Sequence, residues 1–457
     1  MSYFTKYFCS YKLNEDNTLL INTLTNAIDV VDNKLMHFIN KVIKNEEEIS
    51  KINKEEYDKL KQRGYIFDSQ DDEKKLLKKY QKIRKKVLKN TTNINYWTIC
   101  PSMECNLNCP YCYEDNDQHK SHKVLSEKHL DVIFDFILHK KMGNPRIMIF
   151  GGEPLLKTNY KIIEKILKFG QMNNFQIVIT TNGTTLNDEY LNLLSDYKEN
   201  LQVQITLDGN KEEHNKKRIF KNGQGTFDII CNNVNYLLKM KVPVSIRINI
   251  DKNNIKNLEN LKNLFTKQRW NQNDNFVAYV APVRIYTKNE IAIDDSEMLD
   301  IIMKNKWYDH TFIKRLDSSV FDSLFSFFNS SRKSSTVKLW QMSYCAATEG
   351  THYCFAPNGI ITTCLRGIGR KEYMIGEFDE KSVSIDKNKL DMWKNRSPFE
   401  MKKCKDCKFI LLCGGGCAKS SIMKHEDINC GVCNDIEKTL EVYVKYNKDK
   451  FIIKDKG

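Results

Sequence analysis

The sequence predicts an α/β protein built around a partial, TIM-like (β/α)6 barrel of parallel strands. The first observation is an alternation of short strand-like runs with longer helix-like stretches between residues 95 and 285. The strand-like runs are YWTIC, RIMIF, FQIVITT, LQVQITL, VPVSIRINI and NFVAYVAPV, and the helix-like stretches include KHLDVIFDFILHKK and FDIICNNVNYLLKM. The second observation is a cysteine-rich loop directly after the first of these strands. Parallel barrel strands end on one face, so we expect the chemistry in the loops that follow them.

The segments outside the barrel predict smaller units. Residues 1–70 read as a small α+β domain, with strands in TLLINTL and AIDVVDN, a helix in LMHFINKVI, and a helix and strand in EEYDKLKQRGYIF. Residues 71–94 form a basic helical linker. Residues 286–340 are expected to be a helical connector. Residues 341–457 are cysteine-dense and turn-rich, which predicts an irregular domain held together by metal.

Composition narrows the class of protein. The 457 residues carry a formal net charge of +14, and 41% are hydrophobic, which excludes collagen and disulfide-stapled miniproteins. No apolar run approaches the roughly 18 residues of a spanning helix, and the N-terminus lacks a secretory apolar core, so we expect a cytoplasmic protein without a membrane partner. The basic segment 74–89 leaves a nucleic-acid-modifying enzyme as an alternative. No RNA-binding module or stacking motif accompanies it, which argues against a nucleic-acid partner.

The loop ECNLNCPYCYE places Cys105, Cys109 and Cys112 in a C-x3-C-x2-C pattern. Thiolates are the ligands that iron–sulfur clusters prefer, and three of them hold three irons of a [4Fe–4S] cube while the fourth iron stays open. An open coordination position is typical of a catalytic metal site. The alternative is half of a zinc site, for which His119 is a weak candidate as fourth ligand.

This loop resembles the signature of the radical S-adenosylmethionine (SAM) enzymes, whose fold is the same partial barrel. The resemblance implies that Cys105, Cys109 and Cys112 are catalytic, that their open iron binds SAM, and that one electron then yields a 5′-deoxyadenosyl radical. The implied SAM-binding positions are Tyr111, Gly151, Gly152, Glu153, Pro154, Asn182, Thr206 and Arg218.

Individual roles follow from the same resemblance. The glycines let the backbone approach the ligand, and the Glu153 carboxylate is expected to receive the SAM ammonium. Thr206 and Arg218 are expected to bind the SAM ribose and carboxylate. Asp208 and His214 have a structural reading, in which they cap the turn after the fourth strand and brace the loop.

A second field of cysteines lies near the C-terminus. Its members are Cys345, Cys354, Cys364, Cys404, Cys407, Cys413, Cys417, Cys430 and Cys433. The field resembles the SPASM domain, which carries two auxiliary [4Fe–4S] clusters in peptide-modifying radical SAM enzymes. The alternative is a zinc ribbon. Three further cysteines, Cys9, Cys100 and Cys231, stand alone in apolar stretches and are expected to be core thiols.

The SPASM resemblance implies two ligand sets. The first consists of Cys345, Cys364 and Cys417. The second consists of Cys404, Cys407, Cys413 and one of the final pair, with Cys433 favoured and Cys430 left open. Cys354 is a candidate fourth ligand for the first set; without it, one iron stays open for a substrate thiolate.

The expected reaction is a peptide modification. Sulfatase maturases carry an Asp directly after the cysteine matched by Cys364, and this chain has Leu365 there. Residues 1–70 resemble the winged-helix-like RiPP recognition element, which implies a precursor-peptide partner whose leader adds to an exposed sheet edge; a structural cap on the barrel is the alternative. We therefore expect a maturase of the sactipeptide or ranthipeptide type that installs a thioether crosslink, using a flavodoxin or ferredoxin as reductant. Carbon–carbon crosslinking, epimerisation, formylglycine formation and a non-catalytic metal scaffold stay open.

Overall fold

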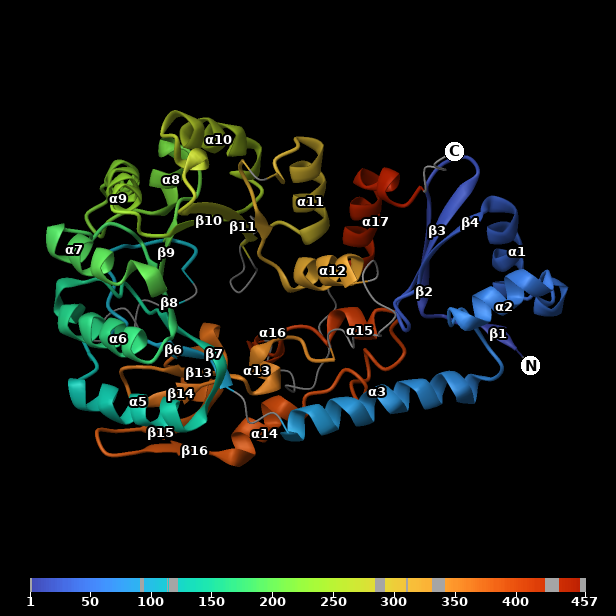
Figure 1. The fold of residues 1–457 in the computed structure, drawn as a ribbon, viewed down its shortest axis with the longest axis horizontal. Coiled ribbons are helices and arrows are strands. Elements are labelled where there is room, and N and C mark those ends of the chain that lie inside the picture. Colours follow the sequence, from blue (N-terminus) through green and yellow to red (C-terminus); the bar gives the residue numbers. More distant parts are fainter. Residues whose placement is uncertain are drawn as a thin grey trace.

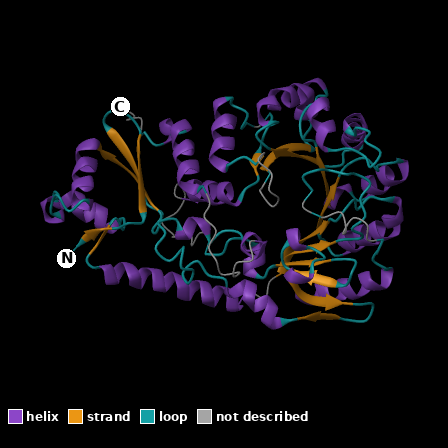
Figure 2. Ribbon diagram, turned by 180° about the vertical axis from the view of Figure 1, so that it is seen from behind, coloured by secondary structure: helices purple, strands orange, loops and turns teal. Residues whose placement is uncertain are grey.

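The structure is a computed structural model, shown in Figures 1 and 2. It describes residues 2–90, 94–112, 114, 122–283, 292–309, 311–330, 342–423 and 435–452. In Figure 2 the strands of the large sheet curve inside an outer row of helices, and the small N-terminal unit lies apart from them at the left.

The barrel strands lie where the sequence predicts them. They are β6 (Ile94–Ile99), β7 (Lys141–Ile149), β8 (Gln176–Thr181), β9 (Leu201–Thr206), β10 (Val244–Ile250) and β11 (Phe276–Pro282). Neighbours pair in parallel in the order β6 to β11, and β12 (Arg315–Leu316) adds to β11. The six predicted strands are therefore confirmed, and all their carboxyl ends meet at one face of the barrel.

Helices cover the outside of this sheet. They are α5 (Glu127–Lys140), α6 (Tyr160–Met172), α7 (Asp188–Asp196), α8 (Lys211–Lys217), α9 (Phe227–Lys239) and α10 (Leu258–Lys267). Alternation along the strands explains the packing: Leu201, Val203 and Ile205 of β9 are buried, whereas Gln202 and Gln204 between them are half-buried. The apolar set packs against the helices, so the polar set faces the interior of the open barrel.

Four further strands extend the barrel sheet. They are β13 (His352–Phe355), β14 (Ile360–Thr362), β15 (Met374–Phe378) and β16 (Val383–Ile385). β13 lies parallel to β6 with Cys354 opposite Thr98, and the strands after it are antiparallel. The sequence predicts only an irregular region here. The difference arises because these strands are short and are stabilised by the edge of β6, a partner more than 250 residues away in the chain.

The N-terminal unit contains the predicted strands and helices and two strands that the sequence analysis missed, β1 (Tyr3–Phe4) and β2 (Phe8–Lys12). Its other elements are β3 (Asn17–Asn22), β4 (Ile28–Asp32), α1 (Asn33–Ile43), α2 (Lys54–Gln62) and β5 (Ile66–Phe67). β2, β3 and β4 form an antiparallel sheet, and β1 pairs with β5.

The basic segment forms the long helix α3 (Gln70–Asn90), which runs from the N-terminal unit along the rest of the molecule (Figure 1). Arg84 on α3 is buried, and its guanidinium donates to the carbonyls of Met342, Lys394 and Arg396 at 2.6–3.0 Å. Tyr80 packs with Tyr7, Leu24 and residues of α15. One side of α3 therefore packs against both the N-terminal unit and the C-terminal region.

The remaining helices complete the connector and the C-terminal region. They are α11 (Asp295–Lys304), α12 (Ser319–Ser330), α13 (Ala346–Glu349), α14 (Lys387–Asn395), α15 (Ile410–Cys413), α16 (Ala418–Met423) and α17 (Ile436–Tyr446). α11 and α12 lie within residues 286–340, the predicted helical connector, together with the short strand β12. None of the helices in the described ranges is long and apolar enough to cross a membrane.

Candidate active site

The three-cysteine loop leaves the carboxyl end of β6 and brings its thiols into one neighbourhood. Cys105 is buried, Cys109 and Cys112 are half-buried, and none of the three is in a disulfide. Burial raises the pKa of Cys109 to about 11, and the nearby Cys105 and Cys112 thiols act in the same direction. A bound metal reverses this preference because a coordinating thiol is deprotonated. Three neighbouring thiols outside any disulfide fit an iron–sulfur cluster, although no three potential ligands in the described ranges converge as around a single ion.

The loop after β7 packs directly on the cysteine loop. A Cβ at Gly152 would lie 2.3 Å from the carbonyl oxygen of Glu104, and one at Gly151 would lie 2.5 Å from that of Ser102. The Glu153 amide donates to the same Glu104 carbonyl at 2.7 Å, just before Pro154. Glycine is therefore required at both positions by backbone-to-backbone contact, as the sequence analysis expects for a close approach.

The Glu153 carboxylate is held by hydrogen bonds from the loops after β7 and β8. It is fully buried, and its carboxylate accepts hydrogen bonds from the Thr181 hydroxyl at 2.6 Å, the Asn182 amide at 2.6 Å and the Leu155 amide at 2.9 Å. Burial raises the pKa of this carboxyl, and these donors oppose the rise. The carboxylate is thus committed to joining the loops after β7 and β8. Its predicted contact with the SAM ammonium stays a prediction.

Asn182 lies at the mouth of the barrel, as predicted. Its side-chain amide donates to Asn106 at 2.8 Å, and Asn106 donates to Thr184 at 2.9 Å. The loop after β8 therefore holds the cysteine loop from a second side.

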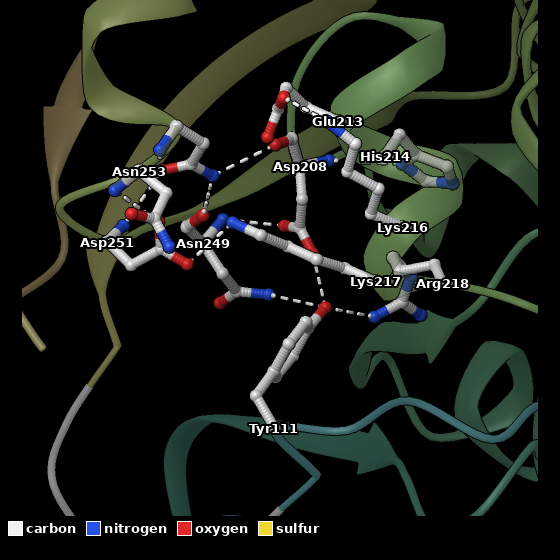
Figure 3. Close-up of polar contacts among 11 residues, drawn as sticks. Tyr111, Asp208, Glu213, His214, Lys216, Lys217, Arg218, Asn249, Asp251 and Asn253 are labelled. Carbon is white, nitrogen blue, oxygen red and sulfur yellow. Dashed lines mark hydrogen bonds and ion pairs between the residues drawn. The ribbon is translucent and has the colours of Figure 1, made fainter. Parts of the chain in front are cut away.

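Tyr111 and Arg218 meet in a half-buried network that joins three strand ends (Figure 3). The Tyr111 hydroxyl donates to Asp208 and accepts from Arg218 Nη1 at 2.8 Å. Asn249 contacts Asp208 and Tyr111. Its backbone amide donates to the Asp208 carboxylate at 2.8 Å, and its side-chain amide donates to the Tyr111 hydroxyl at 3.5 Å. Burial opposes the charge on Arg218, but Tyr111, Cys109 and Asp208 outweigh it and raise the pKa of the guanidinium. Sequence reasoning missed Asn249, whose only signal is an amide side chain at the end of a strand.

Arg218 also carries an unsatisfied donor. Its Nε atom is buried and has no hydrogen-bond partner within the described part of the chain. A carboxylate ligand would satisfy this donor. The arrangement therefore fits the SAM carboxylate that the resemblance assigns to Arg218. Thr206, the other predicted contact, ends β9 opposite Arg247 and is buried.

His214 braces this network, as the sequence analysis expects. Its Nδ1 accepts from the Asp208 amide at 3.2 Å, so Nε2 carries the proton and donates to the Thr226 hydroxyl at 2.9 Å. Thr226 in turn donates to the Arg218 carbonyl at 2.7 Å. Burial, with help from Arg218 and Lys217, lowers the pKa of His214 well below its usual value. The neutral imidazole thus links the backbones of Asp208 and Arg218.

A second polar network lines the barrel interior and was not predicted. Arg247 donates to Asp317 at 2.7 Å and to Tyr279 at 3.4 Å, and Tyr279 donates to Gln204 at 2.5 Å. Arg315 donates to the other oxygen of Asp317 at 2.9 Å. Polar side chains from β9, β10 and β11 thus form a hydrogen-bonded wall on the inner surface of the barrel.

Cys345, Cys364 and Cys417, the first predicted ligand set, influence one another electrostatically, and their joint ligation of a cluster stays a prediction. Burial raises the pKa of Cys364 to about 12, with Cys345 and Cys417 adding to the rise, and burial and Cys417 raise that of Cys345. Cys345 precedes β13, and Cys364 follows the antiparallel β14, so both lie toward the amino-terminal end of β6. This set is therefore at the opposite end of the sheet from the three-cysteine loop.

Cys354 lies apart from Cys345 and Cys417. It is fully buried in a small apolar cluster with Cys100 and Met103, and its sulfur is 3.4 Å from His352 Nε2. Its only neighbour in the first set is Cys364, and burial raises the pKa of the Cys354 thiol. Its role as fourth ligand stays a prediction.

The other cysteines fall into three groups. Cys404, Cys407 and Cys413 lie half-buried around α15. Cys9, Cys100 and Cys231 are buried core thiols, as predicted. Cys430, Cys433 and His119 lie outside the described residues, so the choice between Cys430 and Cys433 stays open.

Comparison with known proteins defines the class. Residues 99–265 match the family model for the Radical SAM superfamily, and they span β6 to α10 with the three-cysteine loop. The chain is a radical SAM enzyme, and enzymes of this class use SAM and a [4Fe–4S] cluster.

Several similar proteins are named as sulfatase-maturating enzymes or are solved with a bound peptide. A cysteine-type anaerobic sulfatase-maturating enzyme from Clostridium novyi is 27% identical over 340 residues, which cover 70% of this chain and 86% of the relative. The structure of anSMEcpe with bound AdoMet and a Cp18Cys peptide is 21% identical, with a TM-score of 0.60, and covers 78% of this chain and 97% of its own. Streptococcus suis SuiB bound to precursor peptide SuiA is 18% identical, with a TM-score of 0.55, and covers 94% of this chain and 99% of its own.

Proposed function

We propose that the protein is a radical SAM peptide maturase that installs a thioether crosslink in a Cys-containing precursor peptide. The observation that carries this proposal is the placement of two cysteine sets at opposite ends of one barrel sheet. Polar side chains of β9, β10 and β11 line the interior of the same barrel. A peptide in the barrel would thus meet a radical-generating site at one end and a thiol-binding site at the other.

The residues for the cofactors are those brought together above. Cys105, Cys109 and Cys112 would hold the radical SAM cluster, and the Gly151–Gly152 backbone and the free donor of Arg218 would hold SAM. The two sets in the C-terminal field would hold auxiliary clusters. When bound, these groups supply one-electron cleavage of SAM to a 5′-deoxyadenosyl radical and an acceptor for the electron released as the carbon–sulfur bond forms.

The protein itself orients the substrate and excludes water. In this reaction the acceptor carbon loses a hydrogen atom to the radical and the substrate thiol loses a proton, so the peptide loses two hydrogens in all. Buried side chains such as Glu153, Asp208 and His214 fix the loops around the reacting centre, which keeps that centre dry.

We also propose that the N-terminal unit binds the leader of the precursor. Within the described part of the chain, β2 pairs only with β3, so its other edge is free for strand addition. A hollow of about 1580 Å³ runs along this edge, lined by residues 8–11 of β2, Ile43, Tyr57 and Lys51. The SuiB match covers 94% of the chain, against 78% for anSMEcpe. This coverage favours a peptide-binding role for the extra N-terminal residues. We propose a flavodoxin or ferredoxin as the reductant, and a cytoplasmic location.

Formylglycine formation is the second candidate because a sulfatase-maturating enzyme is similar to 70% of the chain. Leu365 counts against it. Its side chain packs against the apolar cluster of Cys100, Met103 and Cys354, and leucine has no proton-accepting group.

The test is anaerobic turnover with a Cys-containing peptide encoded beside the gene. Thioether formation removes two hydrogens and leaves the peptide resistant to thiol alkylation, whereas formylglycine formation removes the sulfur; mass spectrometry separates the two. Cys105→Ala should abolish both the product and 5′-deoxyadenosine. A peptide that keeps its free thiol but changes elsewhere would reject the thioether proposal.

Leader binding is tested separately. Ile43→Glu places a charge in the hollow at an exposed apolar residue, and Met172→Glu makes the same type of change on the outer surface of α6. Fluorescence anisotropy with the labelled peptide should show weaker binding for Ile43→Glu only. Equal affinities for the two variants would remove the hollow from the proposal.

A further inference from the structure

Arg396 is a buried guanidinium between the two auxiliary cysteine sets. It follows α14, is 1% exposed, and ranks among the largest fully buried side chains of the described residues. Its Nη1 donates to the Gly416 carbonyl at 2.7 Å and its Nη2 to the Gly415 carbonyl at 2.8 Å. Its own carbonyl accepts from Arg84 at 2.6 Å. The side chain is therefore held in one place by the backbone.

The segment that Arg396 holds connects the two sets. Gly414, Gly415 and Gly416 lie between Cys413 and Cys417, with φ values of 65°, 89° and 73°. Only glycine adopts three such left-handed conformations in succession at low cost. A Cβ at Gly414 would also lie 2.7 Å from the backbone of Ser343. This tight run turns two carbonyls onto the guanidinium and carries the chain from the second set to the first.

The charge of Arg396 lies within electrostatic reach of both sets. Burial lowers its pKa, while the thiols of Cys417 and Cys345 from the first set and Cys404 and Cys413 from the second favour its charged form. Arg84 is a useful contrast. It is equally buried, but the groups that act on it are Glu400, Glu349 and Arg396, and no cysteine is among them.

We propose that Arg396 is the fixed positive charge shared by both auxiliary clusters and that it raises the reduction potential of each. Adding an electron to a cluster makes it more negative, so a buried cation nearby stabilises the reduced form. The role suits clusters that accept an electron from the reaction. This inference rests on the auxiliary clusters of the proposed function, and Arg396 is a positioning and tuning residue that contacts no substrate.

The experiment is an EPR-monitored potentiometric titration of the anaerobically reconstituted, full-length protein. Arg396→Met removes the charge and Arg396→Lys keeps it. Arg84→Met is the matched control, because it removes a buried guanidinium that also binds carbonyls. We expect Arg396→Met to shift the auxiliary oxidation equilibrium at least tenfold towards the oxidised form, which is about 59 mV for one electron. Arg396→Lys, Arg84→Met and the radical SAM cluster should change by less than a third of this.

Each other outcome decides the question. Unchanged auxiliary potentials in Arg396→Met, or an equal shift in Arg84→Met, would overturn the inference. If Arg396→Met loses auxiliary iron, the Arg396→Lys variant decides the question. Iron and potentials retained in Arg396→Lys would support a role for the charge, and iron lost in Arg396→Lys would overturn that role. A wild-type protein without auxiliary clusters would overturn both the cluster assignment and this inference, whereas normal clusters with an inert Arg396→Met would overturn the inference alone.

Discussion

Replacing Gly152 with alanine tests whether the loop after β7 sets the position of the three-cysteine loop. Gly152 is absent from the positive-φ glycines, so alanine fits its backbone conformation. The added methyl group, however, would lie 2.3 Å from the Glu104 carbonyl oxygen and 2.4 Å from that of Met103. Both atoms are backbone and cannot rotate away. The cysteine loop or the β7 loop must therefore move as a unit.

The size of the displacement follows from these contacts. Ordinary contact between heavy atoms begins near 3.4 Å, so the two loops must separate by about 1 Å. Overpacking of this kind costs about 1–3 kcal/mol of folding free energy. A misplacement of about 1 Å at a reacting centre lowers the rate about 100-fold. We therefore expect Gly152→Ala to stay folded and to form 5′-deoxyadenosine about 100-fold more slowly.

The assay follows 5′-deoxyadenosine by chromatography under anaerobic reducing conditions, with calorimetry for stability. Gly170→Ala is the matched control: its Cβ would lie 2.3 Å from the Ile177 side chain, on α6 and away from the cysteine loop. It should lose stability and keep its rate. A rate for Gly152→Ala within about threefold of wild type would refute the argument, because a loop displaced by about 1 Å predicts a much larger loss.

Three further predictions concern the half-buried network. Tyr111→Phe removes a hydroxyl that bonds Arg218, which should cost about 1–3 kcal/mol by calorimetry and raise the KM for SAM; no change in either would contradict the network. Lys217→Met leaves the buried Asp251 carboxylate without its partner at 2.5 Å, and denaturant unfolding should show a loss of about 3–5 kcal/mol that Asp251→Leu largely restores in the double variant. The folded state of His214 has a pKa below the usual 6.5, so the unfolded state binds more protons and stability is lost as pH falls below that value. The stability difference between wild type and His214→Leu should therefore narrow in acid, and a pH-independent difference would exclude a buried neutral imidazole.

Local patterns allowed prediction of the barrel. The apolar–polar alternation of β9 and the long apolar runs of the other strands are properties of neighbouring residues, and they identified all six strands. The strands β13 to β16 could not be found this way. β14 and β16 have three residues each, too few for a pattern, and β13 exists because the edge of β6 supplies its hydrogen bonds.

The candidate site also has one part that local sequence predicts and another part that depends on residues far apart in the chain. The spacing of Cys105, Cys109 and Cys112 is local, so it indicated the cluster loop directly. The direction of the Glu153 carboxylate depends on Thr181 and Asn182 from another strand end, and sequence alone could not show that these donors would capture it. Asn249 and the Arg247–Asp317 pair were missed for the same reason, since their partners come from elements far apart in the chain.

The strand β6 sets the distance between the three-cysteine loop and the C-terminal cysteine field. β6 pairs with β7 on one side and with β13 on the other, and the register sets Thr98 against Cys354 and Ile99 against Phe355. The three-cysteine loop begins beyond the carboxyl end of β6, whereas Cys345 and Cys364 lie toward its amino end. The six residues of this strand span about 20 Å. A rigid strand, and not a flexible linker, thus sets the separation between the two fields.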